Sequence, residues 1–256
     1  MKKLMSIALL SCALALTLHA QVPITVVNGG SFQANAPLAP GSYAQVWGDF
    51  AGFPTADGDL AQLPLATALE NVEVQVNGVA SPLYAVRNVV CAFTVPQAAT
   101  AGQHTIQVLQ NGQVIGEGVI NIVDAFPGIF FARLADGTDV GGVKRTTDYA
   151  DALEATPASR GGAIAIALTG QGTDVANPVG DGDAPAGAES TTNVQPRVFI
   201  AGVEAQVIFS GLYPFFPGLW QINAVIPDEA FISGPVPLVV TMNGIPSNQV
   251  IFWVAE

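Results

Sequence analysis

One pattern of strands and turns occurs twice in this chain, and it constrains the fold more than any single motif. In each copy an apolar strand ends at a proline, a glycine turn follows, and a second strand leads to an Asn-Gly pair. These features lie at 89–96, 101–102 and 111–112 in the first copy and at 220–227, 233–234 and 243–244 in the second. A repeat of this kind is typical of related domains in tandem, so we predict two all-β domains.

The side-chain pattern within the repeats indicates the architecture. Valines alternate with polar residues over 72–76, as in a strand with one buried face, and Asn-Gly pairs at 77–78 and 111–112 predict tight hairpins. Many short strands separated by frequent turns are typical of a β-sandwich. We therefore predict two tandem β-sandwiches, over residues 21–125 and 126–256.

Two segments of the second domain lack a clear strand pattern. Residues 132–160 carry many charges, and we expect them to be irregular, with a short turn of helix near 148–154. Residues 171–193 are rich in glycine and acidic side chains, so we expect a long loop there.

The N-terminus reads as a bacterial secretory signal peptide. Lys2 and Lys3 precede an apolar stretch over 4–18, and the small residue Ala20 suits a cleavage site. We predict a signal peptide over residues 1–20 and an exported protein, extracellular or at the outer cell surface. An alternative is a lipid anchor through Cys12, because Leu-Ser-Cys resembles a lipobox. No later run approaches the length of a transmembrane helix, so we expect no transmembrane segment.

Charge and cysteine content narrow the classes of partner. The net charge is -12, and loss of the two N-terminal lysines with the signal peptide makes it more negative, so we expect no nucleic-acid partner. Cys91 is the single cysteine after residue 20, so no disulfide forms within the exported chain. It aligns with Ile222 in the repeat, which predicts a buried, inert core position and disfavours a reactive thiol.

The second domain resembles a C-terminal β-sandwich domain of secreted Acidobacteria proteins of the Solibacter type, and the first resembles an IPT/TIG-type companion domain. In the second domain the residues that carry the resemblance lie at 126–130, 157–161, 168–172, 216–223, 226–227, 243–244 and 247–248. In the first domain they lie at 28–32, 39–42, 76–79 and 95–96. The resemblance implies an immunoglobulin-like fold, export, and a role as a spacer, adhesive or interaction module. It implies no catalytic residues.

Residue types give little support for an enzyme. His104 is the single histidine of the exported chain, so a Ser-His-Asp arrangement would have to use it, and no Gly-x-Ser-x-Gly elbow occurs. We interpret His104 as a strand residue and rank a secreted hydrolase last.

The acidic loop is the one candidate metal site. Asp174, Asp181, Asp183 and Glu189 lie close together in a stretch rich in glycine and proline. Calcium takes six to eight oxygen ligands, which loop carboxylates can supply. The spacing does not match an EF-hand, and a solvated loop is the alternative. We expect no cofactor other than calcium.

Aromatic residues between two strands are the candidate binding site. Tyr213, Phe215, Phe216 and Trp220 cluster where side chains can reach solvent or the domain junction. They form either a ligand surface or a structural cap. We predict a non-enzymatic interaction, adhesion or spacer module whose partner is a protein or glycan at the cell surface. The alternative function is a carbohydrate-binding module that uses these aromatics.

Overall fold

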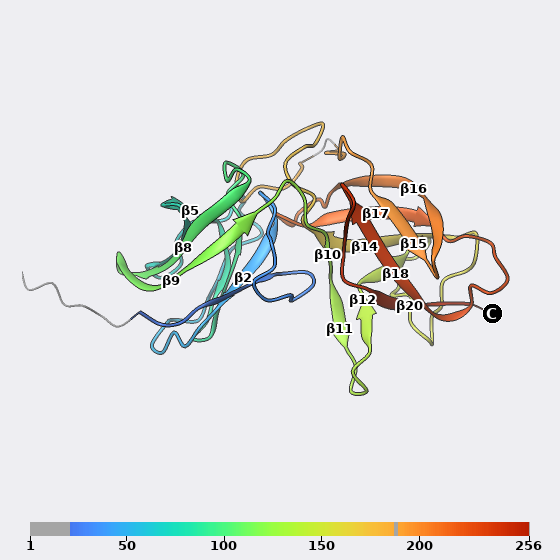
Figure 1. The fold of residues 1–256 in the computed structure, drawn as a ribbon, viewed down its shortest axis with the longest axis horizontal. Helices are drawn as coiled ribbons and strands as arrows, with labels where there is room; N and C mark the ends of the chain where they lie inside the picture. The colour runs from blue at the N-terminus through green and yellow to red at the C-terminus, as the bar shows by residue number, and fades with distance from the viewer. Residues whose placement is uncertain (1–20, 187–188, 256) are drawn as a thin grey trace, which may run out of the picture.

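The computed structural model describes residues 21–186 and 189–255, and these form two β-sandwiches joined end to end (Figure 1). The described residues contain strands, turns and loops and no helix. This confirms the all-β prediction. The expected signal peptide and Cys12 lie outside the described residues.

Domain 1 consists of two packed sheets. The strands of the first sheet, in spatial order, are β1 (Thr25–Asn28), β2 (Tyr43–Trp47), β7 (Val90–Thr94), β6 (Leu83–Val86) and β3 (Ala56–Asp57). Those of the second are β5 (Val79–Ala80), β4 (Val72–Val76), β8 (Gly102–Gln110) and β9 (Gln113–Ile122). Every pairing within the two sheets is antiparallel.

This strand order is that of an immunoglobulin-like sandwich. In that fold strands A, B, E and D form one sheet and strands C, F and G form the other. Here β1, β2, β7 and β6 take the places of A, B, E and D. Strands β4, β8 and β9 take those of C, F and G, with β5 as an added C′ strand.

Domain 2 repeats this order with more strands. Its spatial order is β10 (Gly128–Ile129), β14 (Ala163–Thr169), β17 (Trp220–Val225), β16 (Val203–Leu212), β15 (Arg197–Ile200), β18 (Gly234–Met242), β20 (Val250–Val254), β12 (Asp139–Gly141) and β11 (Phe131–Arg133). Two further strands, β13 (Val143–Arg145) and β19 (Ile245–Pro246), pair with β14 and β18.

Strand β16 belongs to both sheets of domain 2. Its first residues, Val203–Ala205, pair with β15, and its later residues, Gln206–Leu212, pair with β17. The register shifts between Val207 and Phe209, which lets the strand bend from one sheet into the other. In domain 1 the equivalent C′ and D positions are separate strands, β5 and β6, with a proline at 82 between them.

Each domain has its own apolar core. The core of domain 1 draws its buried residues from Val26 to Ile122, and that of domain 2 from Ala125 to Val254. Cys91 and Ile222 are both fully buried and occupy equivalent positions on β7 and β17. The core assignment of Cys91 from the repeat is therefore confirmed.

Four hairpin turns share one backbone conformation. The first turn residue has a positive φ in each: 46° at Asn77, 50° at Asn111, 50° at Ala201 and 51° at Asn243. A glycine with positive φ follows in every case. Two consecutive residues with positive φ make the turn type that matches the twist of a hairpin, which explains the Asn-Gly pairs.

Two expectations for domain 2 are wrong. Residues 148–154 form turns and isolated bridges, and no helical turn is present there. Residues 132–160 are not irregular throughout, because β11, β12 and β13 lie at or within this span. These strands are only three residues long, so their pairing partners decide their conformation more than their own alternation does.

Candidate functional site

The two domains meet without a free linker. Strand β9 ends at Ile122 and β10 begins at Gly128. Within the connection the Phe126 amide donates to the Gly170 carbonyl (2.8 Å), and Asn28 Nδ2 donates to the Phe126 carbonyl (3.2 Å). The connecting segment is therefore bonded to both domains.

A threonine hydroxyl bridges the two domains. Thr169 Oγ1 accepts a hydrogen bond from the Tyr43 amide (2.8 Å) and donates one to the Gly218 carbonyl (2.6 Å). Thr169 is fully buried, while its partners Tyr43 and Gly218 are half-buried. Nearby, Tyr84 of domain 1 donates from its hydroxyl to the Pro217 carbonyl (2.6 Å). Burial raises the pKa of Tyr84 well above its usual value, so this hydroxyl keeps its proton.

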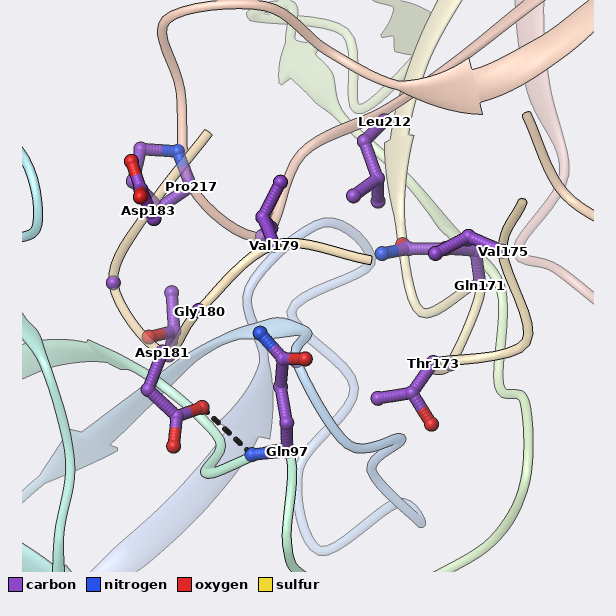
Figure 2. Close-up of a pocket in the computed structure, with 15 residues that line it drawn as sticks. Gln97, Gln171, Thr173, Val175, Val179, Gly180, Asp181, Asp183, Leu212 and Pro217 are labelled. Atoms are coloured by element: carbon purple, nitrogen blue, oxygen red, sulfur yellow. Dashed lines mark hydrogen bonds between the residues drawn. The ribbon is translucent and has the colours of Figure 1, made fainter. Parts of the chain in front are cut away.

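The acidic loop of domain 2 folds onto domain 1. The Gln97 amide donates to Asp181 Oδ1 (2.8 Å), and the Leu65 amide donates to the Gly182 carbonyl (2.8 Å). Figure 2 shows the bond between Asp181 and Gln97. The loop predicted at 171–193 thus bonds domain 1 through Asp181 and Gly182 and forms part of the junction.

A hollow of about 30 Å³ remains between this loop and domain 1 (Figure 2). Two buried oxygen atoms among its lining residues, Thr94 Oγ1 and Gln171 Oε1, have no hydrogen-bond partner among the described residues. The volume suits a single water molecule and no larger ligand. The hollow is therefore part of the domain junction.

The four acids proposed as calcium ligands are not brought together. Asp174 accepts from Asn193 Nδ2 (2.7 Å), Asp181 from the Gln97 amide, and Asp183 from the Ala184 amide (2.9 Å). Within residues 21–186 and 189–255, no group of three or more Asp, Glu, His or Cys side chains is placed to hold a metal ion. Three of the four carboxylates thus bond amide groups of the loop and the junction, so the predicted ligand set does not form.

The aromatic segment divides into buried and exposed parts. Trp220 is fully buried, and its Nε1 donates to Ser210 Oγ (2.9 Å), which in turn bonds Thr192 Oγ1 (2.7 Å). Trp220 therefore belongs to the core, and its proposed role in ligand binding is wrong. It is in phase with Ile222 along β17, which is the sequence pattern that indicates this position.

The remaining aromatics lie outside the core. Phe215 is 71% exposed and Phe216 is 39% exposed, while Tyr213 is half-buried. Tyr213 and Phe216 form a pair with ring centroids 5.7 Å apart. Both line a groove on the outer face of domain 2, and Phe215 does not.

The groove lies over the centre of the β13–β14–β17–β16 sheet. Its floor consists of small or amide side chains that point away from the core. It has two adjoining parts, of about 180 and 350 Å³, which share Tyr149 and Gln221. The main lining residues are Lys144, Tyr149, Ala165, Ala167, Phe209, Tyr213, Phe216, Leu219, Gln221 and Asn223.

Tyr149 and Phe209 line this groove but were not predicted from the sequence as binding residues. Tyr149 lies in the turn after β13, and Phe209 follows the bulge of β16, which shifts the alternation of that strand. The two residues are far apart in sequence from each other and from β14. Only the pairing of β13, β14, β17 and β16 brings them to one face.

His104 and Cys91 both have structural surroundings. His104 Nδ1 lies 2.8 Å from Asn77 Nδ2, and its Nε2 lies 2.6 Å from the Thr100 carbonyl, so the ring joins a hairpin turn to a loop. Cys91 is fully buried, and burial raises the pKa of its thiol to about 12. Neither residue is positioned as a nucleophile or base.

No family model matches this chain, and no curated protein matches it. The similar solved structures include the plexin A4 extracellular region (11% identity, 92% of this chain and 18% of that chain, TM-score 0.28) and bovine butyrophilin (11%, 93% and 100%, 0.23). A family 2 glycosyl hydrolase from Bacteroides cellulosilyticus DSM 14838 is also similar (13%, 90% and 28%, 0.23). The chain thus spans less than a third of the plexin and hydrolase chains. At these scores the likenesses support no argument about function.

None of the described residues forms a helix with the length and apolar character that a membrane crossing requires.

Proposed function

We propose that this protein is an exported, non-enzymatic module of two rigidly joined immunoglobulin-like domains, which acts as a spacer or interaction module at the cell surface. The observation that carries the proposal is the junction. The connecting segment, the acidic loop and the β16–β17 connection all bond across it. Export rests on the sequence of residues 1–20, and membership of the Solibacter-type family stays a prediction.

Close packing of glycines supports a rigid junction. A Cβ on Gly128 would overlap Asn28 Oδ1, and a Cβ on Gly30 would overlap the Gly128 carbonyl. A Cβ on Gly218 would lie within about 3 Å of the Gly41 carbonyl and the Tyr43 amide. These are contacts between domains, and the absence of side chains is what permits them. Such contacts fix one orientation, which a spacer or a presented binding surface requires.

Small-angle X-ray scattering of the exported chain tests the proposal. We expect the wild-type curve to fit one interdomain orientation. Gly128→Ala should broaden the distribution of orientations, because overpacking of this kind costs about 1–3 kcal/mol. Gly180→Ala is the control, since a Cβ there meets nothing within 4 Å. A wild-type curve that requires many interdomain orientations would overturn the proposal.

A further inference from the structure

The groove on the outer face of domain 2 has features that the junction does not explain. Its floor is set by strand register. Ala165 pairs with Lys144 and Asn223, and Ala167 pairs with Gln221. The alanines leave space above the two central strands, while the amides border it. A packed outer face would carry larger side chains at these positions.

Aromatic rings border the same space. Tyr213 and Phe216 come from the β16–β17 connection, Tyr149 from the turn after β13, and Phe209 from β16. Tyr149 is 69% exposed, so its ring is available to a ligand. Aromatic faces carry negative partial charge and attract C–H groups with positive partial charge, such as those on one face of a sugar ring.

The side-chain amides of Gln221 and Asn223 supply directional polar groups between the rings. Gln221 Nε2 donates to Asn223 Oδ1 (2.8 Å). The remaining amide atoms, Gln221 Oε1 and Asn223 Nδ2, have no bond to another described residue. One acceptor and one donor match the hydroxyl groups of a ligand, each of which can donate and accept.

The charged residues at the groove favour a neutral ligand. Among the described residues that line the groove, Lys144 is the one basic side chain, and its Nζ forms an ion pair with Asp151 (2.6 Å). Glu189 borders the other part of the groove, and the chain carries a net charge of -12. A phosphate, sulfate or carboxylate ligand would find no unpaired cation there.

Strand pairing disfavours an extended peptide. Strand β14 pairs on one side with β10 and β13 and on the other with β17, and β17 pairs with β14 and β16. The backbone beneath the groove is thus engaged within the sheet. A peptide cannot add as a further strand here, as it does at a sheet edge. Recognition must come from side chains above the sheet.

We propose that this groove binds a neutral carbohydrate. A sugar ring stacks its C–H face against the aromatic wall of Tyr213 and Phe216, while its hydroxyl groups bond Gln221 and Asn223. The combined volume of the two parts lies in the range of small-molecule sites. The proposal is independent of junction rigidity, so scattering and binding measurements can fail separately.

The test is binding of the exported chain to a panel of neutral oligosaccharides built from glucose, galactose, mannose and N-acetylhexosamines. Affinity for a binder is measured by calorimetry. We expect Gln221→Ala and Tyr213→Ala each to weaken binding about tenfold or more, which corresponds to about 1.4 kcal/mol. Phe215→Ala is the matched control, because this residue lies in the same segment but outside the groove. It should bind as the wild type does.

Ala167→Leu provides a second variant that fills the floor. It should abolish binding without removing any ligand contact, and its melting temperature reports whether the fold persists. Absence of binding to every member of the panel would overturn the proposal, as would binding that Ala167→Leu leaves unchanged. Binding of a peptide that Ala167→Leu blocks, with no carbohydrate bound, would also overturn it.

Discussion

At the scale of single residues, burial decides which side chains are available for chemistry. Cys91 lies between Val46 and Val86 in the strand pairing of domain 1 and has no exposed surface. Desolvation of the thiolate raises the pKa of its thiol from an ordinary value near 9 to about 12. The thiol therefore stays protonated in the folded protein at neutral pH and is inert towards thiol reagents.

The raised pKa of Cys91 predicts a stability change at alkaline pH. Below pH 9 the thiol is protonated in both states and has no effect. Between pH 9 and 12 the unfolded chain ionises first, so the free energy of unfolding falls, by up to about 1.4 kcal/mol per pH unit. Denaturant unfolding at several pH values measures this decline. Cys91→Ala should show a shallower one, although the raised pKa values of Tyr43 and Tyr84 leave a decline in both proteins.

Truncation of two aromatic residues in one segment should have very different effects on the free energy of unfolding. Trp220→Ala removes a fully buried side chain and the partner of Ser210, so we expect a loss of about 3–5 kcal/mol in unfolding free energy. Phe215→Ala removes a side chain that is 71% exposed and should change it by less than about 0.5 kcal/mol. Urea unfolding measures both, and similar losses for the two variants would contradict the assignment of Trp220 to the core.

At the scale of elements, the turns show how strongly local chemistry determines a hairpin. The first residue is asparagine in three of the four hairpin turns described above, and it is alanine in the fourth, at Ala201. All four first residues have a positive φ close to 50°. Alanine is strained in this region, whereas asparagine tolerates it.

The effect of exchanging these turn residues on the free energy of unfolding is therefore predictable. Ala201→Asn should raise the free energy of unfolding by up to about 1 kcal/mol, because asparagine adopts the left-handed backbone conformation of this turn with less strain than alanine. Asn243→Ala should lower it by a similar amount, for the same reason in reverse. Chemical denaturation of both variants, with the wild type as reference, provides the measurement. Ala201 is also packed against the core of domain 2. A loss of stability in Ala201→Asn would show that this contact outweighs the turn preference.

Elements with a strong local pattern were predictable from sequence, and those that depend on distant partners were not. The alternation of valines in β4 and the Asn-Gly turns at 77–78 and 111–112 identified strands and hairpins directly. Strand β12 could not be found in this way, because its pairing with β20 joins residues far apart in sequence. The groove has the same origin, since its walls come from separate segments that only the sheet brings together.

At the scale of the whole molecule, the bonds of Thr169 couple the domains. Thr169→Val keeps the shape of the side chain but leaves the half-buried Tyr43 amide and Gly218 carbonyl without this partner, at a cost of about 1–3 kcal/mol. We expect calorimetry to show one unfolding transition for the wild type and two for the variant. Thr146→Val is the control, because Thr146 Oγ1 bonds Ala163 within domain 2. Separate transitions in the wild type would contradict this coupling.

The passage of β16 from one sheet to the other also affects how copies of the chain meet. The edge of a sheet exposes unpaired backbone groups that can join an edge on another molecule and start aggregation. In domain 2 the first half of β16 pairs with β15 and the later half with β17, and the backbone of residues 190–192 bonds Ser210 and Leu212 near the end of the later half. Domain 1 places the two-residue strands β5 and β3 at the corresponding ends of its sheets. The two domains thus limit such edges differently: in domain 2 a neighbouring segment bonds the end of β16, and in domain 1 the edge strands are short.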